Sequence, residues 1–146
     1  FGARLVYIAT AEAFDIEMKD RIALHQARRG PDWQTVHAPL NLPQALREAD
    51  GKGPCLVDCL TIWLNNLMFA EQETATAVDH LVEAIAARSD PVVLVTNEVG
   101  SGIVPENALA RRFRDEAGRM NQIIAAAVDE VYVSISGILV RIKPQP

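Results

Sequence analysis

The feature that most constrains the fold is a set of short apolar runs separated by longer segments with helical periodicity. Continuously apolar runs are typical of strands that are buried on both faces of a parallel sheet. Apolar residues that recur every three or four positions predict the helices between them. This order predicts an α/β protein whose mostly parallel sheet is flanked by helices. The predicted strands are 5–9, 55–57, 92–95 and 131–135, and the predicted helices are about 15–28, 61–70, 76–88 and 105–128.

Turn residues and chain length refine this picture. Pro105 is a favoured first residue of a helix, so we expect the longest helix to begin there. Residues 138–142 follow a tight turn at Ser136–Gly137, which predicts an antiparallel hairpin strand at the edge of the sheet. The stretch 33–39 is typical of a loop or an edge strand. A length of 146 residues, of which 49% are hydrophobic, fits a single domain.

Charge and cysteine usage exclude several classes of protein. The net charge of -5 argues against nucleic acid as a partner, although a local basic patch suits a small phosphate ligand. No apolar run approaches the roughly 20 residues that cross a bilayer, and no signal peptide pattern is present, so we expect a cytoplasmic protein. Cys55 and Cys59 have neither metal-site nor disulfide-framework spacing, which predicts reduced cysteines in the core.

Polar residues follow each predicted strand. Thr10 follows the first, Asp58 and Thr61 the second, and Thr96–Glu98 the third. If the strands are parallel, these side chains gather at one edge, where ligands of open α/β sheets bind. A carboxylate directly after an apolar strand, as at Asp58, holds Mg²⁺ in many phosphate-handling folds. The same residue type also caps helices, so the pattern leaves both roles open for Asp58.

A second group of candidate residues lies on the first predicted helix. Arg21, His25 and Arg28 or Arg29 are spaced so that they share one helix face. Fixed cations on both sides favour a neutral imidazole, whose nitrogen is a nucleophile toward phosphate esters. The guanidinium groups would hold the polyphosphate and stabilise developing negative charge. The other interpretation is a solvated basic face with an incidental histidine, and spacing alone does not separate the two.

The remaining histidines and arginines give weaker signals. His37 lies in the loop or edge-strand stretch, and His80 lies within a predicted helix. No histidine pair has metal-ligand spacing, so we propose no zinc site. The longest helix carries a basic side for which solvation is the default interpretation, formed by Arg111, Arg112, Arg114 and Arg119.

Several motifs together resemble one family. The longest reads VTNEVGSGIVPEN over residues 95–107. It continues through Leu109–Arg111, Phe113–Asp115, Gly118 and Asn121–Gln122. Shorter motifs occur in the same order at Tyr7–Thr10, Glu17–Met18, Arg21–Ile22, His25, Trp33, Thr35, Asp58–Thr61, Asn65–Leu67 and Ser136–Ile138. Nearly the whole chain thus resembles the bifunctional adenosylcobinamide kinase/adenosylcobinamide-phosphate guanylyltransferases of cobalamin biosynthesis.

The resemblance implies a P-loop NTPase (RecA-like) fold and two activities. One phosphorylates adenosylcobinamide with ATP or GTP, and the other transfers GMP from GTP to adenosylcobinamide phosphate. It implies that His25 becomes guanylylated, that Asp58 serves Mg²⁺, and that Glu98 serves the metal or the acceptor. It also implies a homo-oligomer, a trimer in this family. The nucleotide contacts that it implies are Ala9, Thr10, Ala11, Arg21, Gln26, Ala27, Arg28, Arg29, His37 and Asp58.

Two departures from the family pattern matter. The Gly-rich loop of the form G-x-x-x-x-G-K-S/T, which cradles phosphates, is absent from the chain, so we expect that segment to precede Phe1. His37 stands at a position that is usually glutamate. The competing hypotheses are a P-loop phosphotransferase or NTPase without a covalent intermediate, and a catalytically inactive binding domain.

Overall fold

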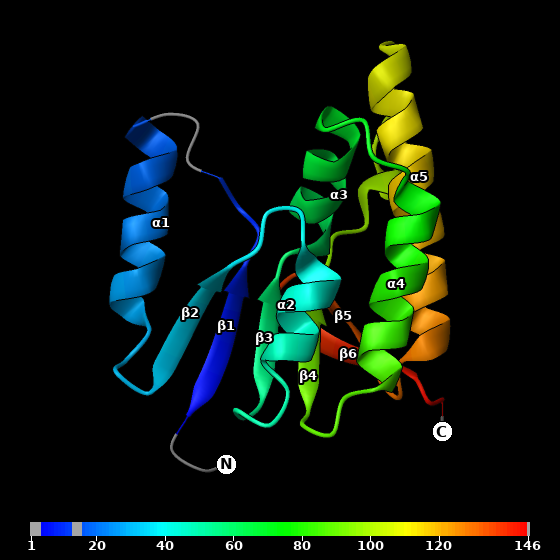
Figure 1. The fold of residues 1–146 in the computed structure, drawn as a ribbon. Coiled ribbons are helices and arrows are strands. Elements are labelled where there is room, and N and C mark those ends of the chain that lie inside the picture. The colour runs from blue at the N-terminus through cyan, green and yellow to red at the C-terminus, as the bar shows by residue number, and fades with distance from the viewer. Residues whose placement is uncertain (1–3, 13–15, 146) are drawn as a thin grey trace.

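The computed structural model describes residues 4–12 and 16–145. These residues form strands and helices in alternation over most of the chain (Figure 1). In chain order the elements are β1 (Leu5–Ala9), α1 (Ile16–Arg28), β2 (Trp33–His37), α2 (Leu42–Glu48), β3 (Cys55–Asp58), α3 (Leu60–Phe69), α4 (Thr74–Ala86), β4 (Val92–Val95), the 3-10 helix η1 (Val99–Ser101), α5 (Ala108–Ala127), β5 (Val131–Ile135) and β6 (Ile138–Lys143).

The main sheet has four strands in the order β2-β1-β3-β4, and every neighbouring pair is parallel. Short apolar strands joined through helices favour this arrangement, because parallel neighbours need a long crossover connection. The predicted mostly parallel sheet flanked by helices is therefore confirmed. The stretch predicted as loop or edge strand forms the edge strand β2, which pairs with β1.

The C-terminal hairpin differs from the prediction in one respect. The turn at Ser136 and Gly137 joins β5 to an antiparallel β6, as predicted, and both turn residues have positive φ, 53° and 76°. Within the described residues, however, β5 pairs only with β6 in a separate two-stranded sheet. The expectation that 131–135 continues the parallel sheet is wrong. A run of apolar residues predicts a strand, but it contains no information on which strand will pair with it.

The start of one helix and the presence of another also differ from the prediction. The longest helix begins at Ala108 and not at Pro105, since the Asn107 side chain accepts hydrogen bonds from the backbone N–H groups of Leu109 and Ala110. Helix α2 was not predicted. It has only seven residues, too few to show a helical period, and its start signals are Asn41 at the N-cap and a proline in the first turn.

The two faces of the sheet have different roles. Side chains alternate along each strand, so Val6, Ile8 and Val57 point to one face while Tyr7 and Asp58 lie on the other. The first face belongs to the hydrophobic core, to which α2, α3, α4 and α5 all contribute buried residues. Helix α1 stands apart from these helices (Figure 1). Tyr7 and Asp58 therefore remain available to a site outside the core.

None of the helices in the described part of the chain is both long and apolar enough to cross a membrane.

Trp63 gives a test of how α3 is fixed in the core. Its side chain is fully buried, and its indole N–H donates a hydrogen bond of 2.9 Å to the carbonyl oxygen of Leu40. We expect Trp63→Phe to lower the free energy of unfolding by about 1–3 kcal/mol, because the carbonyl loses its donor and a small cavity remains. Urea unfolding followed by circular dichroism measures the change. The control Phe69→Leu alters a side chain that is 76% exposed and should shift stability by less than about 0.5 kcal/mol. Equal effects of the two variants would contradict this view.

Candidate active site

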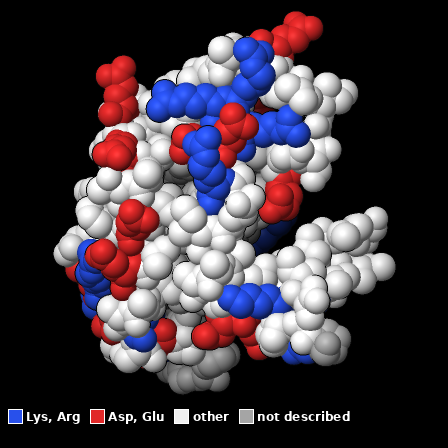
Figure 2. Space-filling model, turned by 90° about the vertical axis from the view of Figure 1, so that its right-hand side faces the viewer, with Lys and Arg blue, Asp and Glu red and all other residues white. Residues whose placement is uncertain are grey.

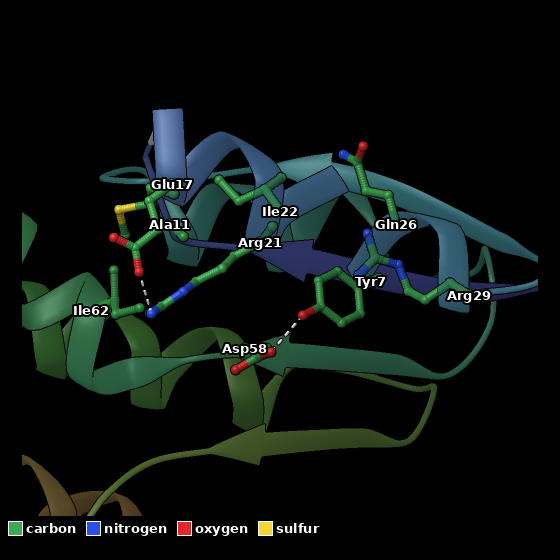
Figure 3. Close-up of a pocket in the computed structure, with 11 residues that line it drawn as sticks. Tyr7, Ala11, Glu17, Arg21, Ile22, Gln26, Arg29, Asp58 and Ile62 are labelled. Carbon is green, nitrogen blue, oxygen red and sulfur yellow. Dashed lines mark hydrogen bonds and ion pairs between the residues drawn. The ribbon is translucent and has the colours of Figure 1, made fainter. Parts of the chain in front are cut away.

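A cleft of about 380 Å³ lies between α1 and the second face of the sheet, at the carboxyl ends of β1 and β3 (Figure 3). This is where open α/β sheets bind their ligands, and the volume suits a small molecule. The described residues that line it are Tyr7, Ala9, Ala11, Glu17, Met18, Arg21, Ile22, Gln26, Arg29, Asp58 and Ile62.

The floor of the cleft contains a hydrogen bond between two neighbouring strands. The hydroxyl of Tyr7 on β1 donates to the carboxylate Oδ2 of Asp58 on β3 over 2.5 Å. Burial raises the pKa of Tyr7 to about 12, and the hydrogen bond and negative charge of Asp58 add to the rise. The phenol therefore stays protonated at neutral pH and acts as a donor. Tyr7 was not among the predicted site residues. The available signals were a hydroxyl-bearing residue inside an otherwise apolar strand and the place of Tyr7 in one of the motifs shared with the family.

The guanidinium of Arg29 packs on the ring of Tyr7. Its central carbon lies 3.6 Å from the ring centroid, a cation–π contact, while Nη2 donates to the hydroxyl of Thr35 on β2 over 3.2 Å. The edge of Trp33 meets the same ring, with centroids 6.2 Å apart and planes at 79°. Within the described residues, the Nε atom of Arg29 is buried and has no hydrogen-bond partner. Arg29 is thus held beside the cleft by a ring and a hydroxyl, without a carboxylate.

Arg21 contributes a second guanidinium to the cleft. It forms an ion pair of 2.7 Å with Glu17 one turn earlier on α1, and the two side chains are 74% and 76% exposed. Figure 3 shows Arg21 extending from α1 across the cleft. An exposed pair of this kind adds little stability, so an anionic ligand can replace Glu17 as the partner of Arg21 at small cost.

Thr10 holds the ends of β1 and β3 together. Its fully buried hydroxyl donates to the carbonyl of Cys59 over 2.8 Å and accepts from the N–H of Cys59 over 2.9 Å. The side-chain amide of Asn66 in turn donates to the carbonyl of Thr10 over 2.8 Å. Thr10 was predicted to contact nucleotide, and the structure places its side chain in the frame of the cleft rather than in its lining.

The structure brings together six of the predicted nucleotide-binding residues in the cleft lining, namely Ala9, Ala11, Arg21, Gln26, Arg29 and Asp58. Ala27 and Arg28 lie on α1, and His37 ends β2, but none of the three belongs to the described lining. His25 occupies a position on α1 four residues after Arg21, whereas Arg29 follows the last residue of the helix, Arg28, and so does not share its face. The side chain of His25 lies outside the described part of the chain.

Glu98 lies in a loop beyond the cleft lining. This loop follows β4 and is tied down from two sides. The hydroxyl of Thr61 on α3 bonds Asn97, and the side chain of Asn121 on α5 donates to the Asn97 carbonyl over 3.0 Å and to the Glu98 carboxylate over 3.5 Å. The Thr96 hydroxyl donates to Asn121 over 2.7 Å. These contacts give the predicted motif at 96–98 a fixed shape.

The arginines of α5 form local contacts. Arg114 donates to the Gly100 carbonyl over 2.5 Å, Arg119 pairs with Glu116 over 2.8 Å, and Arg111 bonds carbonyls just before the helix. On the face of the molecule where α4 and α5 lie, basic and acidic side chains are intermixed (Figure 2). These contacts agree with the interpretation of this helix face as a solvated surface.

The carboxylate of Asp58 makes the cleft suitable for Mg²⁺. Among the described residues, no cluster of three or more His, Cys, Asp or Glu side chains forms a cage for a metal. Mg²⁺ does not require one, because it keeps several waters and binds through one or two carboxylates together with substrate phosphates. Asp58 presents an oxygen at the cleft that is not bonded to Tyr7, so its donor chemistry fits this ion.

The fold and the cleft define a class of protein. The guanidinium groups of Arg21 and Arg29 and the carboxylates of Glu17 and Asp58 line a cleft at the carboxyl ends of parallel strands, which is the arrangement of an α/β enzyme that handles nucleotides. Comparison with known proteins defines the family. Residues 1–142 match the family described as cobinamide kinase / cobinamide phosphate guanyltransferase. The chain belongs to this family, which confirms the predicted resemblance.

Curated relatives agree with this assignment. A Pseudomonas aeruginosa protein named bifunctional adenosylcobalamin biosynthesis protein CobP is 41% identical, over 99% of this chain and 86% of its own length. An Escherichia coli protein named bifunctional adenosylcobalamin biosynthesis protein CobU is 39% identical, over 97% of this chain and 87% of its own length. A Salmonella typhimurium protein of the same name is 43% identical, over 96% of this chain and 86% of its own length.

The junction at Thr10 can be tested by removing its hydroxyl. We expect Thr10→Val to lower the free energy of unfolding by about 1–3 kcal/mol, because the buried N–H of Cys59 loses its hydroxyl acceptor and the Cys59 carbonyl keeps only the N–H of Trp63 as a donor. Thr10→Ser keeps the hydroxyl and should lose less. Thr76→Val, at an exposed position on α4, is the control. Urea unfolding gives the three values, and a Thr10→Val variant as stable as its control would show that the junction is dispensable.

The two cysteines provide a test by pH. Both are free and buried, as predicted, and burial raises the pKa of Cys55 to about 11 and raises that of Cys59 as well. Only the thiolate attacks a disulfide reagent. At about pH 8, where an ordinary thiol is partly ionised, we expect the native protein to react with Ellman's reagent far more slowly than the urea-unfolded chain. Equal rates would show that the thiols are accessible and ionised in the folded state.

Proposed function

We propose that this protein is an adenosylcobinamide kinase and adenosylcobinamide-phosphate guanylyltransferase that carries GMP on His25. The observation that carries the proposal is the position of α1. This helix borders a cleft with Asp58 on its floor, its residue 25 lies one turn after Arg21, and Arg29 follows the end of the helix and also lines the cleft. Membership of the cobinamide kinase / guanyltransferase family supports both activities.

In the first step the neutral imidazole nitrogen of His25 attacks the α-phosphorus of GTP. A phosphorus–nitrogen bond forms, the bond from that phosphorus to the bridging oxygen breaks, and pyrophosphate leaves with the electron pair. Arg21 and Arg29 hold the phosphates and stabilise the negative charge that develops on their oxygens. Glu17 releases Arg21 as the phosphate arrives, which the exposure of that ion pair permits.

In the second step a phosphate oxygen of adenosylcobinamide phosphate attacks the same phosphorus. The phosphorus–nitrogen bond breaks, His25 is regenerated, and the product is adenosylcobinamide-GDP. The phosphate acceptor is made by the kinase activity, which transfers the terminal phosphoryl group of ATP or GTP to the hydroxyl of adenosylcobinamide. In the kinase activity the protein's contribution is to position charged groups, whereas in GMP transfer His25 also supplies the nucleophile.

Asp58 is the residue proposed to hold Mg²⁺, together with waters and phosphate oxygens of the nucleotide. When bound, Mg²⁺ supplies positive charge to the phosphates. Glu98, on a loop fixed by Thr61 and Asn121, is proposed to serve the acceptor or a metal from the end of β4. Ala9, Ala11 and Gln26 line the space left for the rest of the nucleotide.

A homotrimer in the cytoplasm remains part of the proposal. Two apolar side chains of α1 support an interface on this helix, since Ile16 is 78% and Leu24 59% exposed. Burial of exposed apolar side chains of this size would stabilise association between copies of the chain.

The covalent intermediate provides the test. After incubation of the full-length protein with GTP and Mg²⁺, intact-mass spectrometry should show a GMP adduct on the wild type and none on His25→Ala. His80→Ala, which changes an exposed histidine on α4, is the matched control and should keep the adduct. The bond should survive denaturation, because a phosphoramidate is covalent.

Two results would count against the proposal. A wild-type protein that binds GTP without forming an adduct would favour a phosphotransferase that has no covalent intermediate. An adduct that persists in His25→Ala would move the nucleophile to another residue.

A further inference from the structure

We propose that Tyr7 is a positioning residue for Asp58, and that its hydroxyl sets the orientation in which the carboxylate meets Mg²⁺·GTP. This inference rests on the proposed function, in which Asp58 serves the metal-bound nucleotide. Neither the motifs nor the spacing of the sequence assigned Tyr7 a role beyond that of a strand residue. The geometry of the cleft floor carries the inference.

The first observation is the hydrogen bond itself. Tyr7 and Asp58 come from adjacent parallel strands, in a register that pairs Tyr7 with Leu56 and Ala9 with Asp58. The hydroxyl therefore reaches diagonally to Oδ2 over 2.5 Å, while the other carboxylate oxygen is left for a ligand. A carboxylate at the end of a strand has several rotamers, and a single strong donor restricts it to one of them. Figure 3 shows the two side chains directed toward each other.

The second observation is that the ring of Tyr7 is itself immobilised. Its side chain is only 7% exposed, Arg29 covers one ring face at 3.6 Å, and Trp33 meets the ring edge-on. A donor that is fixed from two sides can fix its acceptor. The same ring also locates Arg29, so the cation and the anion proposed to meet one nucleotide take their positions from one side chain.

The third observation separates positioning from packing. The core of the protein lies on the opposite face of the sheet, where Val6 and Ile8 are buried. Tyr7 lines the cleft instead. Its ring supplies the contacts with Arg29 and Trp33, and a phenylalanine ring would supply them equally. The hydroxyl adds only the bond to Asp58, so removing it isolates the positioning role.

The experiment is a double-mutant cycle in the full-length protein, with wild type, Tyr7→Phe, Asp58→Asn and the double variant. Calorimetry measures the affinity for a non-hydrolysable GTP analogue with Mg²⁺ and with EDTA, and the ratio gives the gain in affinity due to the metal. Rapid-quench measurement gives the rate of GMP transfer to the enzyme. Tyr132→Phe removes an exposed hydroxyl that bonds Glu130, and is the matched control.

We expect Tyr7→Phe to reduce the Mg²⁺-dependent gain and the transfer rate by about 10-fold, the lower range for loss of a residue that orients a metal ligand. The affinity measured in EDTA should not change. In the Asp58→Asn background the same substitution should have no further effect, because Tyr7 acts through Asp58. Tyr132→Phe should match the wild type in every measurement.

Two outcomes would overturn the inference. One is a Tyr7→Phe variant with the Mg²⁺-dependent gain of the wild type, and the other is an equal loss with and without the Asp58 carboxylate. Failure of the proposed function is a separate result. It would appear as a wild type without a GMP adduct, and the affinity cycle would still decide whether Tyr7 positions Asp58.

Discussion

The hydroxyl of Thr10 exchanges two hydrogen bonds with the backbone of Cys59, and this exchange joins β1 to β3 at the point where both strands end. Strand ends are where a parallel sheet loses its regular ladder, so buried N–H and carbonyl groups there need other partners. Because Thr10 supplies them, the chain can leave the sheet and α3 can begin at once at Leu60. Asp58 therefore sits on a fixed strand end rather than on a mobile loop, and its hydrogen bond with Tyr7 depends on that position.

Side chains alternate along the strands, so one face of the sheet belongs to the core and the other lines the cleft. The odd and even positions of β1 differ in function, with Val6 and Ile8 in the core and Tyr7 in the cleft. The core can be packed closely by α2 to α5 without constraining the chemistry on the other side. Helix α1 borders the cleft, and none of its described side chains belongs to that core cluster. It is thus free to present mainly polar and charged side chains to a ligand.

The sequence predicted the elements well and their assembly less well, for a physical reason. Apolar runs and helical periods are local, so β1, β3, β4 and the helices beside them could be located in advance. Pairing is not local, and the same apolar pattern describes β4, which joins the parallel sheet, and β5, which does not. Helix α2 is too short for its period to be visible.

In the candidate site, too, local features were predicted and features that depend on strand pairing were not. That Arg21, Arg29 and Asp58 serve one nucleotide site was predicted from the family resemblance, since spacing alone gave the arginines and Asp58 as two separate groups. The contacts of individual side chains depend on the register between strands. Thr10 was expected at the rim and turns inward to Cys59. Tyr7 was not singled out because only the pairing of β1 with β3 brings its hydroxyl to Asp58. For His25 the sequence predicts a position on the helix and a chemical role, and the role stays a prediction.

The Tyr7 side chain also resolves a conflict between charge and function. An arginine and an aspartate that pair directly satisfy each other, and neither remains available to a ligand without breaking the pair. Among the described ion pairs none joins Arg29 to Asp58. Tyr7 stands between them, with its ring face toward the guanidinium and its hydroxyl toward the carboxylate. Tyr7 is neutral, so it holds Arg29 and Asp58 in place without cancelling their charges. A site that binds both a phosphate anion and a metal cation requires both of these charges.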